Sequence, residues 1–191
     1  MAILVEFKNA WHDKHTDAQK NLCAEFANAV LSCAKMAAVH MGGADFSSSG
    51  AHGLKAESRF FSDSPKAHRF YRASAGSTIE RAVYQYLISG FNGVEVQKNV
   101  YKSSLSDLVF AFEFTGSLDG HFPCSFKNSR PDIRVSLGKG TDGVVYEVLF
   151  DLTSEKQQGH ILGKGDNWVA KANIPYIAEV LWTDHDIMHK G

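Results

Sequence analysis

The strongest constraint on the fold is a ten-residue stretch, 144–153, in which apolar side chains occupy every even-numbered position. In an extended strand such residues share one face, because successive side chains point to opposite sides. Residues 131–137 alternate in the same way, and the glycine-rich segment 138–143 between the two stretches favours a hairpin turn. A slip of one residue would turn either apolar set toward water. The pattern therefore predicts two antiparallel strands that bury a shared apolar face and leave a polar face opposite.

The rest of the chain predicts a mixed α/β fold around this hairpin. We expect helices at 16–41 (capped by Thr16 or Asp17), 77–90 and within 154–172, and strands at 94–101, 108–114 and Ile174–Thr183. Residues 3–7 are either a short strand or the lead into the first helix. We expect residues 1–76 to form an N-terminal helical extension and loop, and residues 77–191 to form one compact core.

Composition limits the functional classes. The chain has a formal net charge of −1 and therefore lacks the excess of basic residues that many nucleic-acid-binding proteins have. Any phosphate-binding surface must be local or completed by a metal ion. The three cysteines have no paired spacing, which favours reduced, buried thiols. No apolar stretch is long enough to cross a membrane, and Glu6 comes too early for a signal sequence. We expect no membrane partner, and a protein that is cytoplasmic in the producer cell or delivered without a cleaved signal.

Two carboxylates converge on the polar face of the hairpin. If Leu137 pairs with Val144, Asp132 lies diagonal to Asp151, with Cβ atoms roughly 7 Å or less apart. A shift of two residues would place the two side chains directly opposite each other. Like charges at this spacing repel unless they share a proton or a cation. Because Mg²⁺ is commonly held by one or two carboxylates, the pair is a candidate site for Mg²⁺ or Mn²⁺.

Glu147 is a rival metal ligand, because it shares the face with Asp151. Arg134 would oppose it directly in the same register, so we expect Glu147 to form an ion pair with Arg134 instead. Asp151 lies in a strand otherwise rich in valine, leucine and phenylalanine, where aspartate is disfavoured. The sequence therefore favours Asp132 and Asp151 as the functional pair.

The segment Pro131-Asp132, followed after eighteen residues by Asp151-Leu152-Thr153, resembles the motif of PD-(D/E)xK nucleases. The element order over residues 77–183 is similar to the αβββαβ core of restriction-endonuclease-like proteins. This resemblance implies a small mixed sheet flanked by helices, Asp132 and Asp151 as metal ligands, and hydrolysis of phosphodiester bonds. Thr153 stands where the family has its lysine, so it either positions water or caps the next helix.

The resemblance also implies roles for residues around the pair. Lys156 or Lys164 would replace the missing lysine, with Lys164 favoured, and Glu80 would be a third metal ligand from the first core helix. The remaining candidates are Gln157 or Gln158 near the reacting phosphate, His160 as a phosphate contact or general acid on the helix face of Lys164, and Arg130, Lys156 and Lys127 as phosphate contacts.

Residues 151–164 further resemble nuclease toxin domains of bacterial antagonism systems. We therefore expect a metal-dependent DNase that acts as an antibacterial toxin and has a cognate immunity protein as partner. Nucleic acid is the expected substrate, with DNA preferred and RNA possible. Three alternatives stay open: a transfer-RNA-cutting RNase toxin on the same fold, a non-catalytic interaction or immunity-type protein, and a metal-free hydrolase that uses His160 as a base.

Overall fold

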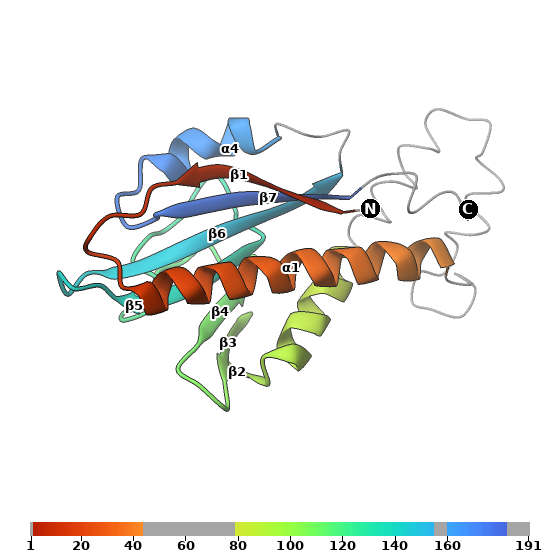
Figure 1. The fold of residues 1–191 in the computed structure, drawn as a ribbon, viewed down its shortest axis with the longest axis horizontal. Coiled ribbons are helices and arrows are strands. Elements are labelled where there is room, and N and C mark those ends of the chain that lie inside the picture. Colours follow the sequence, from red (N-terminus) through yellow and green to blue (C-terminus); the bar gives the residue numbers. More distant parts are fainter. Residues whose placement is uncertain (1, 44–78, 155–159, 183–191) are drawn as a thin grey trace.

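The fold is built on one seven-stranded mixed sheet (Figure 1). The computed structural model describes residues 2–43, 79–154 and 160–182. The elements in chain order are β1 (Ile3–Asn9), α1 (Asp17–Gly43), a helix over residues 79–90, β2 (Gly93–Gln97), β3 (Val100–Ser103), β4 (Val109–Phe112), β5 (Ile133–Lys139), β6 (Val145–Ser154), α4 (His160–Val169) and β7 (Tyr176–Trp182). The strand order is β1-β7-β6-β5-β4-β3-β2. Only β6 and β7 are parallel neighbours, and α4 lies in the connection between them. The α/β class with a mixed sheet is therefore confirmed.

Both faces of the central strands are covered. Phe26 of α1 packs against Phe110 and Phe150 of the sheet, with ring centroids 5.8 and 5.9 Å apart. The helix over residues 79–90 contributes to the same apolar cluster. On the opposite face, Trp168 of α4 packs with Leu149 and other apolar side chains. The expectation of one apolar and one polar face was too simple, because α4 and the segment after β4 also bury the second face.

The N-terminus of α1 forms as its sequence predicts. The Thr16 hydroxyl accepts a hydrogen bond from the Gln19 amide at 3.1 Å, and the Gln19 side chain accepts one from the Thr16 amide at 3.0 Å. This reciprocal arrangement is a capping box, which satisfies two backbone donors at the helix start. Residues 77 and 78, where the second helix was expected to begin, lie outside the described residues.

The sheet is larger than the small sheet that was expected. β1 pairs antiparallel with β7, so the first residues of the chain form an edge strand of the same sheet, and α1 lies across its face. The expected single strand at 94–101 is wrong: it is the β2–β3 hairpin, which turns at Lys98 and Asn99. Asn99 has φ 64°, a left-handed conformation that asparagine tolerates better than most residues.

The register of the β5–β6 hairpin differs from the first expectation by two residues. Arg134 pairs with Leu149, and Ser136 pairs with Glu147. β5 continues two residues further than expected, through Gly138 and Lys139, and a bulge between Ser136 and Gly138 takes up one residue. Gly138 has φ 72°, which suits a glycine at a bulge. The shift matters for function because it places Asp132 opposite Asp151.

None of the helices in the described parts of the chain is both long enough and apolar enough to cross a bilayer.

Candidate active site

A line of acidic residues crosses four neighbouring strands at one level of the sheet. Asp151 of β6 pairs in register with Glu179 of β7. The β5–β6 pairing, continued by one residue beyond Ile133 and Phe150, brings Asp132 opposite Asp151. The Glu113 amide, just after β4, donates a hydrogen bond to the Asp132 carbonyl at 2.9 Å. We call Glu113, Asp132, Asp151 and Glu179 the acidic row.

Three members of the acidic row are almost completely buried. Asp132 is 8% exposed, Asp151 0% and Glu179 2%. Isolated buried charges are strongly disfavoured, so such groups are normally paired, protonated or bound to a cation. Burying several carboxyl groups side by side therefore costs folding free energy. A strand with only a structural role does not need such an arrangement.

The pKa of Asp132 depends strongly on the charged groups around it. Its pKa is raised well above its ordinary value, first by burial and then by repulsion from Asp151 and Glu80. The Leu152 amide opposes this increase by donating a hydrogen bond to Asp132 Oδ2 at 2.7 Å. The bond joins the end of the loop before β5 to β6, so it also fixes the orientation of the Asp132 carboxyl group.

Lys164 brings a positive charge to the acidic row from α4. Its Nζ lies 3.0 Å from Asp151 Oδ1 and 3.5 Å from the Arg130 carbonyl oxygen. The same ammonium group lies 5.7 Å from the centre of the Trp168 ring. The structure therefore brings a lysine from the following helix to the carboxylate pair, where the sequence of β6 offers only Thr153.

Glu80 adds a further carboxyl group from the helix over residues 79–90. Its pKa is raised to about 7, first by burial and then by repulsion from Glu113 and Asp151, while Arg130 and Lys164 lower it. The side chain thus lies within electrostatic range of the acidic row. This agrees with its expected position on the first core helix.

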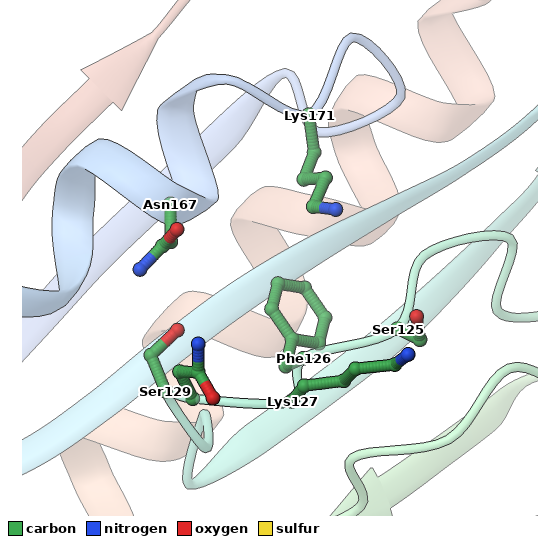
Figure 2. Close-up of a pocket in the computed structure, with 7 residues that line it drawn as sticks. Ser125, Phe126, Lys127, Ser129, Asn167 and Lys171 are labelled. Carbon is green, nitrogen blue, oxygen red and sulfur yellow. The ribbon is translucent and has the colours of Figure 1, made fainter.

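Glu113 and Arg130 form the more exposed border of the site. Arg130 Nη2 lies 3.2 Å from Glu113 Oε1. Glu113 has φ 51°, and non-glycine residues in this conformation are uncommon and often lie at functional sites. Lys127, the other residue of this segment considered as a phosphate contact, lines a pocket beside α4 (Figure 2).

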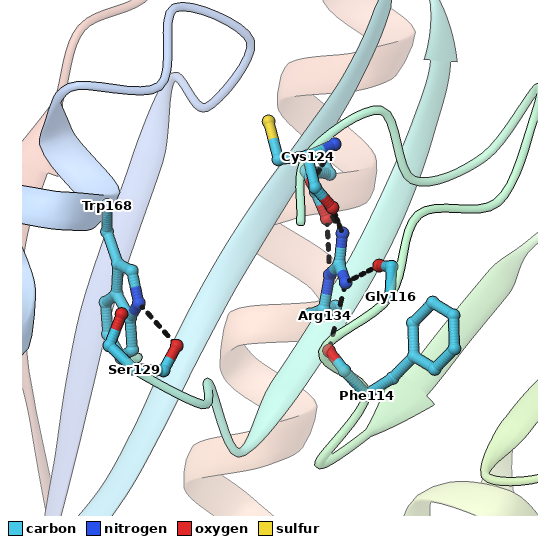
Figure 3. A network of polar contacts seen from close by, with 7 residues as sticks. Phe114, Gly116, Cys124, Ser129, Arg134 and Trp168 are labelled. Atoms are coloured by element: carbon cyan, nitrogen blue, oxygen red, sulfur yellow. Dashed lines mark hydrogen bonds and ion pairs between the residues drawn. The ribbon is translucent and has the colours of Figure 1, made fainter. Parts of the chain in front are cut away.

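Glu147 is not part of the acidic row, because it forms an ion pair with Arg134. Arg134 Nε lies 2.7 Å from Glu147 Oε2, and Arg134 Nη2 lies 2.8 Å from Oε1, with both side chains fully buried. The guanidinium group also donates to the carbonyl oxygens of Phe114, Gly116 and Cys124 at 2.6 to 2.9 Å (Figure 3). The predicted ion pair is confirmed, although the two residues are diagonal and not directly opposite.

The other predicted residues divide into two groups. Thr153 is 3% exposed and shares the strand face of Asp151 by alternation. His160 is the first residue of α4, but its side chain is outside the described part of the structure. Lys156, Gln157 and Gln158 lie outside the described residues altogether.

The sequence interpretation missed Glu113 and Glu179. Glu179 is the single charged residue of the otherwise apolar strand β7, and such an isolated carboxylate is a signal that the sequence offered. Glu113 follows the apolar strand β4 in the same way. Neither residue can be aligned with Asp132 and Asp151 before the pairing of the strands is known.

The donor set fits a magnesium-like ion that keeps much of its water. Among the described residues, no group of three or more His, Cys, Asp or Glu side chains is placed to hold a metal ion by itself. Mg²⁺ does not need such a group, because it is usually bound by one or two carboxylates together with waters and substrate phosphate oxygens. The two buried, mutually repelling carboxyl groups of Asp132 and Asp151 meet that requirement.

Comparisons with protein-family models, with curated proteins and with solved structures give no match.

Proposed function

We propose that this protein is a metal-dependent nuclease that hydrolyses phosphodiester bonds, with Asp132 and Asp151 as ligands of Mg²⁺ or Mn²⁺. The observation that carries the proposal is the pair of buried carboxyl groups on neighbouring strands, with Lys164 at 3.0 Å from one of them. Two carboxylates on one sheet face and a lysine beside them, here from α4, are the groups that the PD-(D/E)xK motif requires. After the helix over 79–90, the chain adds β2 and β3 before the series β4, β5, β6, α4 and β7. The order is that of an αβββαβ core only with these two strands as an insertion, and in that form it supports the same assignment.

The cation would supply positive charge beside the scissile phosphate and acidify water next to it. Asp132 and Asp151 hold the charge that attracts the cation, and the Leu152 amide keeps the Asp132 carboxyl group in place. Lys164 has three donors, of which one is directed to Asp151 and a second to the Arg130 carbonyl oxygen, so the third can stabilise negative charge that develops on the phosphate. Glu80, with its pKa of about 7, can exchange a proton near neutral pH or join the metal ligands.

The test is cleavage of supercoiled plasmid and of total RNA by the purified protein over a Mg²⁺ titration. Asp132→Asn and Asp151→Asn keep the shape of each side chain and remove its charge. We expect either change to lower cleavage at least about 100-fold, because it leaves only one charged carboxylate in the proposed metal-binding pair. Asp107→Asn, on an exposed residue, is the matched control. Equal cleavage by all four proteins, or cleavage unaffected by EDTA, would contradict the proposal.

Lys164→Met tests the assignment of the lysine separately. We expect cleavage to fall about 10²- to 10³-fold, as for loss of one preorganised charge donor, while Mg²⁺ binding by isothermal titration calorimetry persists. A variant with unchanged cleavage would remove Lys164 from the mechanism.

We further propose that the enzyme is a DNase toxin of bacterial antagonism, delivered into a target cell and neutralised by an immunity protein in the producer. The resemblance of residues 151–164 to toxin nucleases supports this use of the site. Induced expression in a bacterial host should stop growth for the natural sequence and not for Asp132→Asn or Asp151→Asn. Loss of chromosomal DNA assigns DNase activity, whereas cleaved transfer RNA with intact DNA assigns the RNase alternative.

A further inference from the structure

A pocket of about 250 Å³ lies beside the acidic row, between the segment 125–129 and α4 (Figure 2). We call it the lysine pocket. Its lining includes Phe126, Lys127, Asn128, Ser129, Asn167 and Lys171. In Figure 2 the side chains of Lys127 and Lys171 lie on opposite walls, with the Phe126 ring between them.

The lining has the chemistry of a binding site for one nucleotide. None of its described residues is acidic, in contrast to the neighbouring acidic row. Two ammonium groups can bind phosphate oxygens. Asn128 and Asn167 each carry two donors and an acceptor, which can pair with the polar edge of a base. The buried ring of Phe126 gives the floor an apolar surface.

Two chain segments connect the lysine pocket to the proposed catalytic centre. Lys164 and Asn167 are three residues apart on one side of α4, and Lys171 lies just after the helix, where it lines the pocket together with Asn167. The Lys171 amide continues that turn by donating to the Trp168 carbonyl at 3.0 Å. On the other wall, the Ser129 carbonyl accepts a hydrogen bond from Trp168 Nε1 at 3.3 Å. One step further along the chain, the Arg130 carbonyl faces Lys164.

The two sites are close enough for one polynucleotide strand to pass both. The five helical steps from Lys164 to the end of α4 at Val169 span about 7.5 Å, and Lys171 lies two residues further along the chain. The pocket of about 250 Å³ is smaller than the roughly 300–1,000 Å³ of pockets that enclose a whole small molecule. It therefore suits one unit of a longer ligand. A base can enter such a pocket only when it is outside a base-paired stack.

We infer that the lysine pocket binds one unpaired nucleotide of the substrate strand, near the phosphate held at Asp132 and Asp151. Lys127 and Lys171 bind its phosphate, and Asn128 and Asn167 contact its base. This inference rests on the proposed nuclease function, and it adds a preference for single-stranded or locally unpaired substrates.

The test is the binding of fluorescein-labelled oligonucleotides, measured by anisotropy in an Asp151→Asn background so that the strands stay intact. The probes are single-stranded DNA, single-stranded RNA and a DNA duplex, each about 12 nucleotides long. Lys127→Ala/Lys171→Ala should weaken binding of single strands at least about tenfold and lower the salt slope by about 1.4, the contribution of two phosphate contacts. Lys98→Ala/Lys139→Ala removes the same charge from exposed positions that do not line the pocket and should change affinity less than about twofold.

Asn167→Ala separates a pocket from a merely positive surface, because it removes no charge. Asn167→Ala should change the relative affinity for single-stranded DNA homopolymers of the four bases at least about threefold and leave the salt slope unchanged. Equal losses in both lysine pairs, an equal loss for the duplex, or no oligonucleotide binding at all would overturn the inference. Because this assay measures binding without cleavage, a functional pocket in a protein that cuts nothing would refute the nuclease proposal alone. Normal cleavage with an inert pocket would refute the pocket alone.

Discussion

Replacing Glu80 by glutamine tests the electrostatic description of the site most directly. The pKa of Glu80 rises from its ordinary value of 4.5 to about 7 on folding, so between these pH values the folded chain binds more protons than the unfolded chain. Stability must therefore fall as pH rises through this window, by about 1.4 kcal/mol for each pH unit. Because water reaches part of the side chain and screens its charge, we expect a total of about 2–3 kcal/mol.

Glu80→Gln removes this proton uptake. It also relieves the repulsion that raises the pKa of Asp132, which acts in the same direction. The free energy of unfolding of the variant should therefore rise relative to that of the natural protein as the pH increases from about 4.5 to about 8. The difference should reach about 2–3 kcal/mol at the upper end of this range. Below pH 4.5 both proteins carry a neutral group at this position, and the difference should disappear.

Urea unfolding at a series of pH values in EDTA measures this difference. Glu25→Gln, on an exposed position of α1, is the control and should follow the natural protein at every pH. Saturating Mg²⁺ should recover much of the lost stability of the natural protein at high pH, because a cation offsets the same repulsion. Parallel pH curves for the natural protein and Glu80→Gln would refute the reasoning.

Three further substitutions test residues that surround the proposed site. Arg134→Met leaves the Glu147 carboxylate buried without its partner and should destabilise the protein by about 3–5 kcal/mol in urea, with a smaller loss in Arg134→Met/Glu147→Leu; equal losses would contradict the ion-pair assignment. In Gly165→Ala the new Cβ would lie 2.5 Å from the Phe7 ring, so α4 should shift and cleavage fall at least about tenfold, whereas Ala170→Gly should leave cleavage nearly unchanged. Glu179→Gln should lower the Mg²⁺ affinity in calorimetry if the acidic row acts as one electrostatic unit, and unchanged affinity would exclude Glu179 from it.

The elements near the site could be predicted because their sequence patterns are local. Alternation identified β5 and β6, and an apolar run identified β7. The pairing of the acidic residues was harder to predict, since the bulge at Gly138 changes the register. That bulge depends on a backbone conformation that several glycines of the loop could adopt.

The contribution of Glu179 could not be predicted for a different reason. β6 and β7 are parallel, and their alignment is set by the packing of α4 and by the pairing of β7 with β1. No turn links the two strands closely enough to fix which residues face each other. Burial of the second sheet face was missed as well, because its cover comes from residues 114–126, a turn-rich segment with no helical or strand period.

The order in which the chain is made gives the acidic row a further consequence. Its members are separated by 66 positions, from Glu113 to Glu179, and the strand that carries Glu179 is held between β6 and the N-terminal strand β1. A ribosome-bound chain that lacks β7 therefore has neither the complete row nor the closed edge of the sheet. Contacts between such distant residues form late in folding. The acidic row is therefore complete only after the strand that carries Glu179 has been inserted between β6 and β1.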